Sequence, residues 1–225
     1  MKVLSAHLWE KEKDISHMPI SLVLQQACIG RKNIVLACIC EGKNVGEPGV
    51  TESGYFTEGL TEWFHREGVR LCERKEEKNA VSALYAEITR LEKENKDYIG
   101  RKGLEVSLHY WGIFLIEEKG WIFAQGDCKG FLLNRRFQKK NMREILLLQN
   151  WEAGRLFPVK VQKKIGILLC TGSFCKDWIQ ENIIEVLLPD GEMTEERMEK
   201  RLQELWQEQV RMEKGSMAGA IYLRT

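Results

Sequence analysis

Residues 34–40, Ile-Val-Leu-Ala-Cys-Ile-Cys, form a continuous apolar run that limits the architectures open to this chain. The run contains β-branched residues and is far shorter than the roughly 20 residues needed to span a bilayer. A short apolar run of this kind predicts a strand that is buried on both faces. Other parts of the chain must then pack over both sides of it.

The segments that follow this strand predict a loop and two helices. Residues 41–49 contain several glycines and a proline, which is typical of a loop. Apolar residues at helical spacing predict one helix opened by Thr51 and a second from about Asn79. The apolar positions of these helices are Phe56, Leu60, Trp63 and Phe64, then Val81, Leu84, Ile88, Leu91 and Tyr98.

The second half of the chain changes to a strand period. Residues 104–136 alternate or cluster as strands do, with a hairpin turn at 117–120. Two further strands are expected at 165–170 and 218–223, and two helices over about 176–187 and from Thr194. This order of elements predicts an α+β layered domain in which helices cover sheets.

The composition indicates the class of protein. A chain of 225 residues suits a single domain over residues 1–225 with a sizeable core. Its 34 basic and 33 acidic side chains nearly cancel, which excludes a global field that would attract nucleic acid or an anionic membrane. Seven cysteines without a regular framework indicate reduced thiols and a cytoplasmic location. The charged residues at 10–14 are unlike a signal peptide.

Cysteine and histidine spacing does not predict a metal site. Cys38 and Cys40 would share one face of a strand, and without a second Cys/His pair a structural role explains them better than zinc. The four histidines have no ligand spacing, which indicates surface or packing roles. They are His7, His17, His65 and His109.

A basic cluster follows Gly126-Asp127. We expect it in a solvated loop, where Arg could also bind an acidic or phosphorylated segment. No aromatic residues are interleaved to support nucleic-acid binding. The cluster consists of Arg135, Arg136, Lys139, Lys140 and Arg143.

Four short motifs lie where predicted strands begin or end. Each dipeptide is common by itself, whereas four in order at strand ends form a recognisable pattern. They are Glu41-Gly42 after the first core strand, Gly126-Asp127 at a corner between two strands, Thr171-Gly172 after the next core strand, and Ala218-Gly219 at the start of the last strand.

In this order the motifs resemble those of the metal-dependent type 2C (PPM-type) Ser/Thr protein phosphatases. The resemblance runs from about Ile34 to the end of the chain, and residues 1–30 match poorly. It implies an α-β-β-α sandwich of two antiparallel sheets flanked by helices, with Gly126-Asp127 in a hairpin. It also implies hydrolysis of phosphoserine and phosphothreonine by two divalent ions that carboxylates hold.

The resemblance assigns the metal positions residue by residue. Glu41 and Asp127 keep a carboxylate, and Gly42 keeps a backbone carbonyl. Three positions are degenerate because they have lost the side-chain oxygens that the family carries there: Gly172, Ala218 and Gly219.

Other residues could contribute to such a site. Arg31 is the trace of a phosphate-binding motif, although a solvated loop residue is the simpler interpretation. Acidic groups at Asp177, Asp190 or Glu192 could rebuild a single-metal site. No catalytic residue is assigned.

The lost carboxylates predict a catalytically impaired domain, a pseudophosphatase, that needs no cofactor. It would bind a phosphorylated or regulatory protein partner, and neither nucleic acid nor membrane. The alternative is an active, divergent Ser/Thr protein phosphatase that binds Mn²⁺ or Mg²⁺ through Glu41 and Asp127. A third interpretation is an unrelated interaction domain, in which the four motifs would not converge.

Overall fold

The computed structural model describes most of the chain, and the account below is limited to that part. The described residues are 4–10, 20–44, 52–102, 106–136, 139–144, 156–162, 165–172, 174, 180–187, 194–210 and 218–225.

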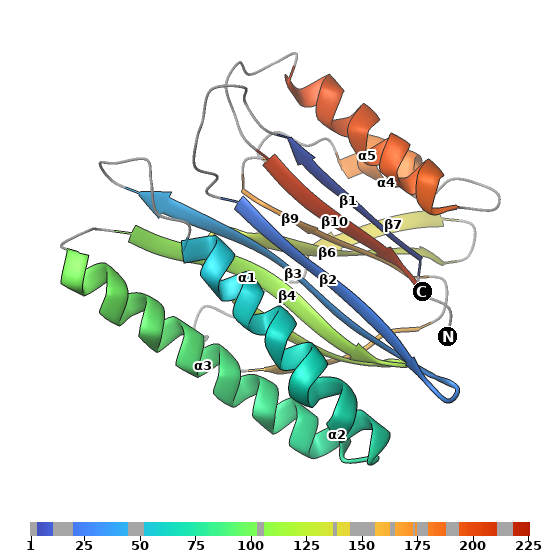
Figure 1. The fold of residues 1–225 in the computed structure, drawn as a ribbon. Helices are drawn as coiled ribbons and strands as arrows, with labels where there is room; N and C mark the ends of the chain where they lie inside the picture. Colours follow the sequence, from blue (N-terminus) through green and yellow to red (C-terminus); the bar gives the residue numbers. More distant parts are fainter. Residues whose placement is uncertain are drawn as a thin grey trace.

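Two antiparallel sheets pack face to face, and helices cover the outer face of each (Figure 1). Sheet B has the strand order β2 (Ile20–Ile29), β3 (Lys32–Asn44), β4 (Val106–Ile116), β5 (Lys119–Gln125) and β8 (Phe157–Lys160). Sheet A has the order β1 (Leu4–Glu10), β10 (Ala218–Arg224), β9 (Gly166–Cys170), β6 (Lys129–Arg136) and β7 (Lys139–Glu144). The predicted α-β-β-α sandwich is confirmed.

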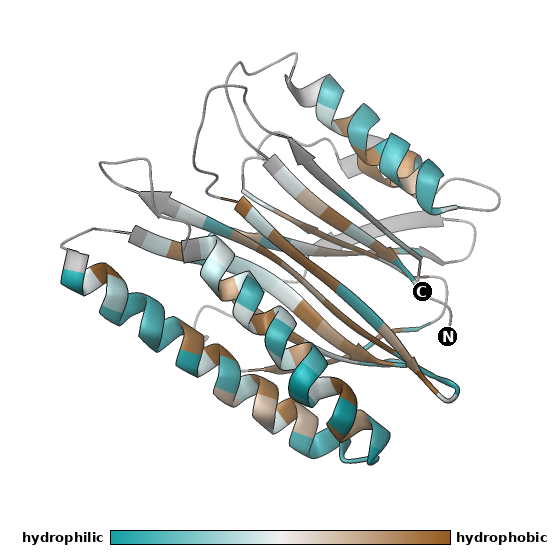
Figure 2. Cartoon of the chain, in the orientation of Figure 1, coloured by the Kyte–Doolittle hydropathy of each residue, from teal (hydrophilic) through white to brown (hydrophobic). Residues whose placement is uncertain are grey.

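The two sheets have separate sets of helices. Sheet B is covered by α1 (Glu52–Trp63), the π-helical turn η1 (Phe64–Gly68), α2 (Val69–Glu73) and α3 (Glu77–Lys102). Sheet A is covered by α4 (Gln180–Leu187) and α5 (Glu195–Val210). Figure 2 shows that α5 is hydrophilic on its outer side and hydrophobic toward sheet A.

Strand β3 is buried on both faces along its apolar run, as that run predicts. Cys38 and Cys40 lie in the core between sheet B and its helices, while Val35 and Ile39 lie in the core between the two sheets. Both thiols are fully buried, and burial raises the pKa of Cys38. The two cysteines therefore share a face, as expected.

The helices over sheet B follow the predicted pattern with two exceptions. Leu84, Ile88 and Leu91 are fully buried on α3, but Val81 is only half-buried and Tyr98 is 46% exposed. Tyr98 lies two turns after Leu91 on nearly the same side of the helix, but Asn95 is the last buried side chain described on α3, and Tyr98 lies beyond it near the end of the helix. The expectation that Val81 and Tyr98 face the core was wrong.

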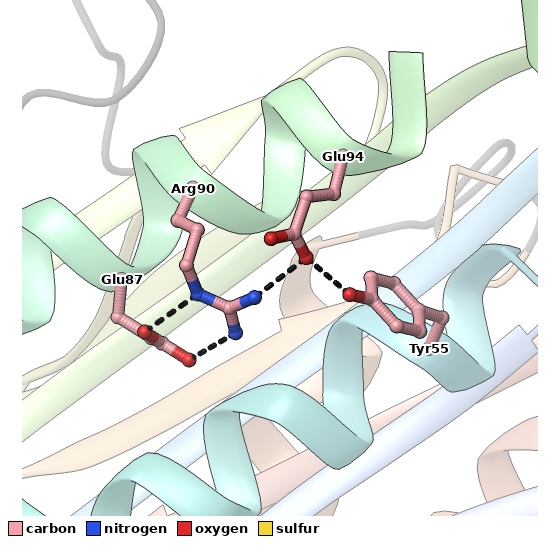
Figure 3. A network of polar contacts seen from close by, with 4 residues as sticks. All are labelled: Tyr55, Glu87, Arg90 and Glu94. Atoms are coloured by element: carbon pink, nitrogen blue, oxygen red, sulfur yellow. Dashed lines mark hydrogen bonds and ion pairs between the residues drawn. The ribbon is translucent and has the colours of Figure 1, made fainter. Parts of the chain in front are cut away.

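An ion-pair network fastens α1 to α3 on the outer surface (Figure 3). Arg90 binds Glu87 at 2.6 Å and Glu94 at 2.5 Å, and the Tyr55 hydroxyl donates to Glu94. Glu87 is 8% exposed, whereas Tyr55 is 46% exposed. Exposed pairs of this kind contribute about 0.2–1 kcal/mol each.

A carboxylate also ties α3 to sheet B. The buried Tyr110 hydroxyl donates to Glu92, and burial raises the pKa of Glu92 above its usual 4.5. We expect Tyr110→Phe to lower the free energy of unfolding by about 1–3 kcal/mol, because it leaves a half-buried carboxylate without this donor. Urea denaturation at neutral pH measures the loss.

The pH dependence of Glu92 provides the control. Since its folded-state pKa is raised, its contribution to stability is greatest below pH 4.5 and is lost as the pH rises through the folded-state pKa. Glu92→Gln should therefore gain stability relative to the natural chain as the pH rises from about 4 to 7. An equal difference at both pH values would contradict this account.

The Gly126-Asp127 corner joins two sheets and is not the tip of a hairpin. Strand β5 pairs with β4 and β8 in sheet B, whereas β6 pairs with β7 and β9 in sheet A. Gly126 has a φ of +76°, which a glycine adopts without strain, and the chain crosses between sheets there. The hairpin expectation was wrong because each strand has other partners.

Trp111 of sheet B packs against Gly130 of sheet A in the core between the two sheets. Trp111 of β4 is 1% exposed and lies in the core between the sheets. A Cβ placed on Gly130 of β6 would lie 2.1 Å from Trp111 Cζ2. The ring occupies the space that any side chain at residue 130 would need.

Several predicted boundaries change in the structure. Glu41–Asn44 belong to β3 and not to a loop, because β4 pairs with them as far as Val106. The basic cluster lies on the paired strands β6 and β7 and not in a loop. The strands β1, β2, β7 and β8 were not predicted. Residues 45–51, 175–179 and 211–217 lie outside the described part. They include part of the predicted loop, the predicted helix start at Thr51 and the first residues of the helix predicted at about 176–187.

Candidate functional site

The site is built from the ends of several strands, starting with β3. Glu41 lies opposite Ile20 of β2 on one side and opposite His109 of β4 on the other. Gly42 follows, opposite Leu108. Glu41 and Gly42 are half-buried. The sequence motif is therefore held inside a sheet, with neighbours on both sides.

Asp127 is held against the same strand β4 by His109. The Asp127 N–H donates to His109 Nδ1 at 2.8 Å, and Asp127 Oδ2 lies 3.5 Å from that nitrogen. His109 Nε2 lies 2.7 Å from Ser107 Oγ. Because Nδ1 accepts the backbone N–H, this arrangement assigns the ring proton of a neutral His109 to Nε2. The imidazole therefore lies beside the carboxylate on which the metal hypothesis depends.

Gly172 lies next to Asp127. A Cβ placed on Gly172 would be 3.4 Å from the Asp127 carbonyl oxygen and 3.5 Å from its Cβ. These are ordinary van der Waals distances, and the φ of Gly172 is not in the left-handed region. A side chain at residue 172 would therefore fit, and it would lie beside Asp127.

Gly219 closes the arrangement. The Thr171 N–H donates to the Gly219 carbonyl at 3.1 Å, and the Gly219 N–H donates to Thr171 Oγ1 at 3.3 Å. A Cβ on Gly219 would be 2.9 Å from Ile20 Cγ2, and Ile20 pairs with Glu41. Strands β2 and β10 start at the same end of the sandwich (Figure 1).

The four motifs thus converge at one end of the two sheets. Glu41 lies opposite His109, His109 bonds to Asp127, and Asp127 lies beside Gly172. Thr171, which precedes Gly172, bonds to Gly219, and Gly219 lies against Ile20, the partner of Glu41. These neighbours form a closed ring of residues. Ala218 precedes Gly219 at the start of β10. The interpretation as an unrelated domain, in which these positions stay apart, is therefore wrong.

The chemistry of the converging residues does not fit a two-metal centre. Two adjacent dications need several carboxylates to neutralise them. Glu41 and Asp127 supply carboxylates, whereas Gly172 and Gly219 supply none. Within the described residues, no group of three or more His, Cys, Asp or Glu side chains could hold a metal ion. Asp177, Asp190 and Glu192 lie outside the described part.

Arg31 is not brought to this site. It is exposed in the turn between β2 and β3, next to Gly30 with its φ of +62°. Strand β3 separates it from Glu41 by about 30 Å. The β2 residue that pairs with Glu41 is Ile20.

His109 was missed as a site residue. Its position in an alternating strand indicated only a surface or packing role. Its contact with Asp127 depends on how β4 and the Gly126-Asp127 corner meet, and no motif in the sequence encodes that contact. A histidine just before a buried aromatic residue is the only local signal.

The arrangement of two helix-covered antiparallel sheets, with these strand ends gathered at one place, is the fold of the type 2C protein phosphatases. One solved structure with this fold is PppA, described as a key regulatory component of T6SS in Pseudomonas aeruginosa. It is 13% identical with a TM-score of 0.71, and the match covers 100% of this chain and 98% of that one.

Two more structures extend the comparison. The catalytic domain of the serine/threonine phosphatase PstP, in complex with two manganese ions, is 13% identical with a TM-score of 0.65 and coverage of 99% and 97%. A protein of the bacterial stressosome is 8% identical with a TM-score of 0.61 and 99% coverage of both chains. At these identities the likeness shows the fold alone.

Other comparisons add no closer relationship. No protein-family model matches the sequence, and no curated protein matches it. In the part of the chain that the structure describes, no helix is long and apolar enough to cross a membrane.

Proposed function

We propose that this chain is a catalytically impaired domain with the type 2C phosphatase fold, which acts in the cytoplasm as a regulatory module. It binds a phosphorylated or regulatory protein partner and requires no cofactor. Cys28, Cys38 and Cys72 are free thiols, which supports a reducing compartment.

The observation that carries the proposal is the loss of oxygen ligands at positions that the fold still brings together. Gly172 and Gly219 lie in the ring with Glu41 and Asp127, yet they offer no side-chain oxygen. Changes in the surroundings of a metal site already reduce affinity or activity by roughly 10–100-fold. The loss of direct ligands should have a larger effect. His109 also binds the Asp127 backbone and lies beside its carboxylate.

A regulatory role is consistent with the proteins that share the fold. PppA is described as a regulatory component, and another structure with the fold belongs to the stressosome. This likeness supports a role in regulation and leaves the partner to be identified.

The alternative function is metal-dependent hydrolysis with a single ion between Glu41 and Asp127. One observation favours this alternative: the two residues that carry the carboxylates, Glu41 and Asp127, are both neighbours of His109. Asp127 is 62% exposed at its side chain, so it is accessible from solvent.

Calorimetric titration with Mn²⁺, together with hydrolysis of p-nitrophenyl phosphate, tests the proposal. We expect no saturable heat and no turnover above that of Asp127→Asn, because two ligands are missing. Asp97→Asn, an exposed change on α3, is the matched control. Metal binding and turnover that persist in Asp97→Asn but disappear in Asp127→Asn would establish the alternative.

A further inference from the structure

The continuous helical segment α1–η1–α2 carries a line of exposed charges on its outer side. The line begins with two glutamates on α1 and continues with three arginines, through η1 to the C-cap of α2. Each member follows the one before it by four residues, and all of the side chains are exposed: Glu58, Glu62, Arg66, Arg70 and Arg74. We call this line the charged ridge. It has an acidic half and a basic half.

The π-helical turn keeps the ridge in line. In an α-helix, residues four apart drift around the axis by about 40° per step, because one turn takes about 3.6 residues. A π-helical turn closes its hydrogen bond one residue later, as the Val69 N–H does with the Phe64 carbonyl, and therefore rotates less per residue. Since η1 lies in the middle of the ridge, it offsets the drift of the α-helical steps on either side. The arginines thus stay on the same side as the α1 glutamates.

The ridge does not stabilise its own helix. Like charges four residues apart repel each other, and this applies to the step between the two glutamates and to both steps between the arginines. Only the step from Glu62 to Arg66 joins opposite charges. None of the five side chains makes an ion pair within the part of the chain that the structure describes. A solvated helix face typically alternates the sign of its charges, whereas the ridge separates them.

Neighbouring groups leave the two halves opposite in sign. Glu67 and Glu73 lie among the three arginines, but Lys75 adds a further exposed cation, so the basic half keeps an excess of positive charge. On the neighbouring helix α3, Arg90 is held by two glutamates of its own helix (Figure 3). It therefore does not neutralise the acidic half of the ridge.

Two such ridges are complementary when they lie antiparallel. The register that sets Glu62 against Arg66 of a second copy also sets Glu58 against Arg70 of that copy. Each pair occurs twice, because a two-fold axis exchanges the copies. The same register brings Tyr55, which is 46% exposed, beside Arg74 of the second copy, where a guanidinium can lie over the ring. A parallel arrangement in register would set like charges against each other.

We propose that the charged ridge is a self-docking surface through which two copies of this chain form a symmetric, salt-sensitive dimer. Each acidic half then lies against a basic half, which supplies the opposite charges that the ridge lacks along its own helix. The inference is independent of the proposed function, because the ridge residues are not part of the candidate site.

Analytical ultracentrifugation of the full chain tests the inference. At roughly 0.1 mM protein and low salt, where surface charges act most strongly, we expect a dimer that dissociates in about 1 M NaCl. Glu58→Arg/Glu62→Arg makes the ridge basic throughout, and Arg66→Glu/Arg70→Glu makes most of it acidic. Each variant alone should self-associate at least roughly tenfold more weakly. An equimolar mixture of the two should form a heterodimer, because their ridges are complementary to each other.

The matched control is Lys93→Glu/Lys96→Glu on the exposed side of α3, which changes the net charge by as much as the arginine variant does. It should dimerise like the natural chain. A monomeric natural chain, an equal loss in this control, a mixture that stays monomeric, or a dimer that salt does not weaken would each overturn the inference. If a charge-reversed variant unfolds, glutamine at the same two positions replaces it, since that change relieves the repulsion within the helix. Unchanged self-association of the glutamine variants would also overturn the inference.

Discussion

Gly130→Ala is expected to lower the free energy of unfolding by about 3 kcal/mol, because a new methyl group in a packed core forces its neighbours off their positions. The added carbon would lie 2.1 Å, 2.2 Å and 2.6 Å from three atoms of the Trp111 ring. Trp111 is 1% exposed between the two sheets, so the ring has no free space into which to move. Such a loss is a large part of the 5–15 kcal/mol that is typical of a folded domain.

Urea denaturation of Gly130→Ala and of a matched glycine variant measures this effect. Gly100 lies on α3 with no atom within 4 Å of an added Cβ, so Gly100→Ala should raise stability by about 0.5–1 kcal/mol. Trp111→Phe in the Gly130→Ala background should recover part of the loss, since a smaller ring relieves the overlap. Equal stability of the two alanine variants would contradict the packing described between the sheets.

Under the proposed function, carboxylates added at residues 172 and 218 should create a metal site that the natural chain does not have. We expect the double variant Gly172→Asp/Ala218→Asp to bind Mn²⁺ at least ~100-fold more tightly than the natural chain, because it adds direct ligands to the existing ones. The added Cβ at residue 172 meets only ordinary contacts with Asp127. Calorimetry measures the affinity, and p-nitrophenyl phosphate hydrolysis shows whether activity returns with it.

The matched control adds the same charge elsewhere. Ala86→Asp/Gly100→Asp places two carboxylates on the exposed side of α3 and should leave Mn²⁺ binding unchanged. If both double variants bind the ion equally, the gain reflects net charge and not site geometry. If neither binds it, the residues at positions 172 and 218 are not what limits metal binding.

The elements predicted correctly are those whose patterns are local. The apolar run of β3, the buried face of α1, the start of α5 and the last strand β10 each follow from residues close together in the chain. Thr194 Oγ1 accepts the Arg197 N–H at 3.3 Å, as expected for a residue that opens a helix. The missed strands have weaker patterns, since β7 is charged and β8 is short and largely exposed.

The features that were wrong or missed depend on contacts between distant segments. A turn at Gly126-Asp127 is visible in the sequence, but the sequence does not show that the strands beside it enter different sheets, where β5 pairs with β8 and β6 pairs with β9. The contact of His109 with Asp127 has the same origin. The convergence of the four motifs could be predicted only from the family resemblance, because no local pattern relates Glu41 to Gly219.

The pairing of β1 with β10 has a consequence for how the chain reaches its fold. Leu4 lies opposite Arg224, so the first described strand has no partner until the last one exists. Most of sheet B and its helices come from one continuous stretch, from Ile20 to Gln125, whose contacts can form during synthesis. Closing the loop between β1 and β10 is the slow, long-range step. On the ribosome, sheet B should therefore assemble first, and sheet A should be completed only after the final strand has emerged.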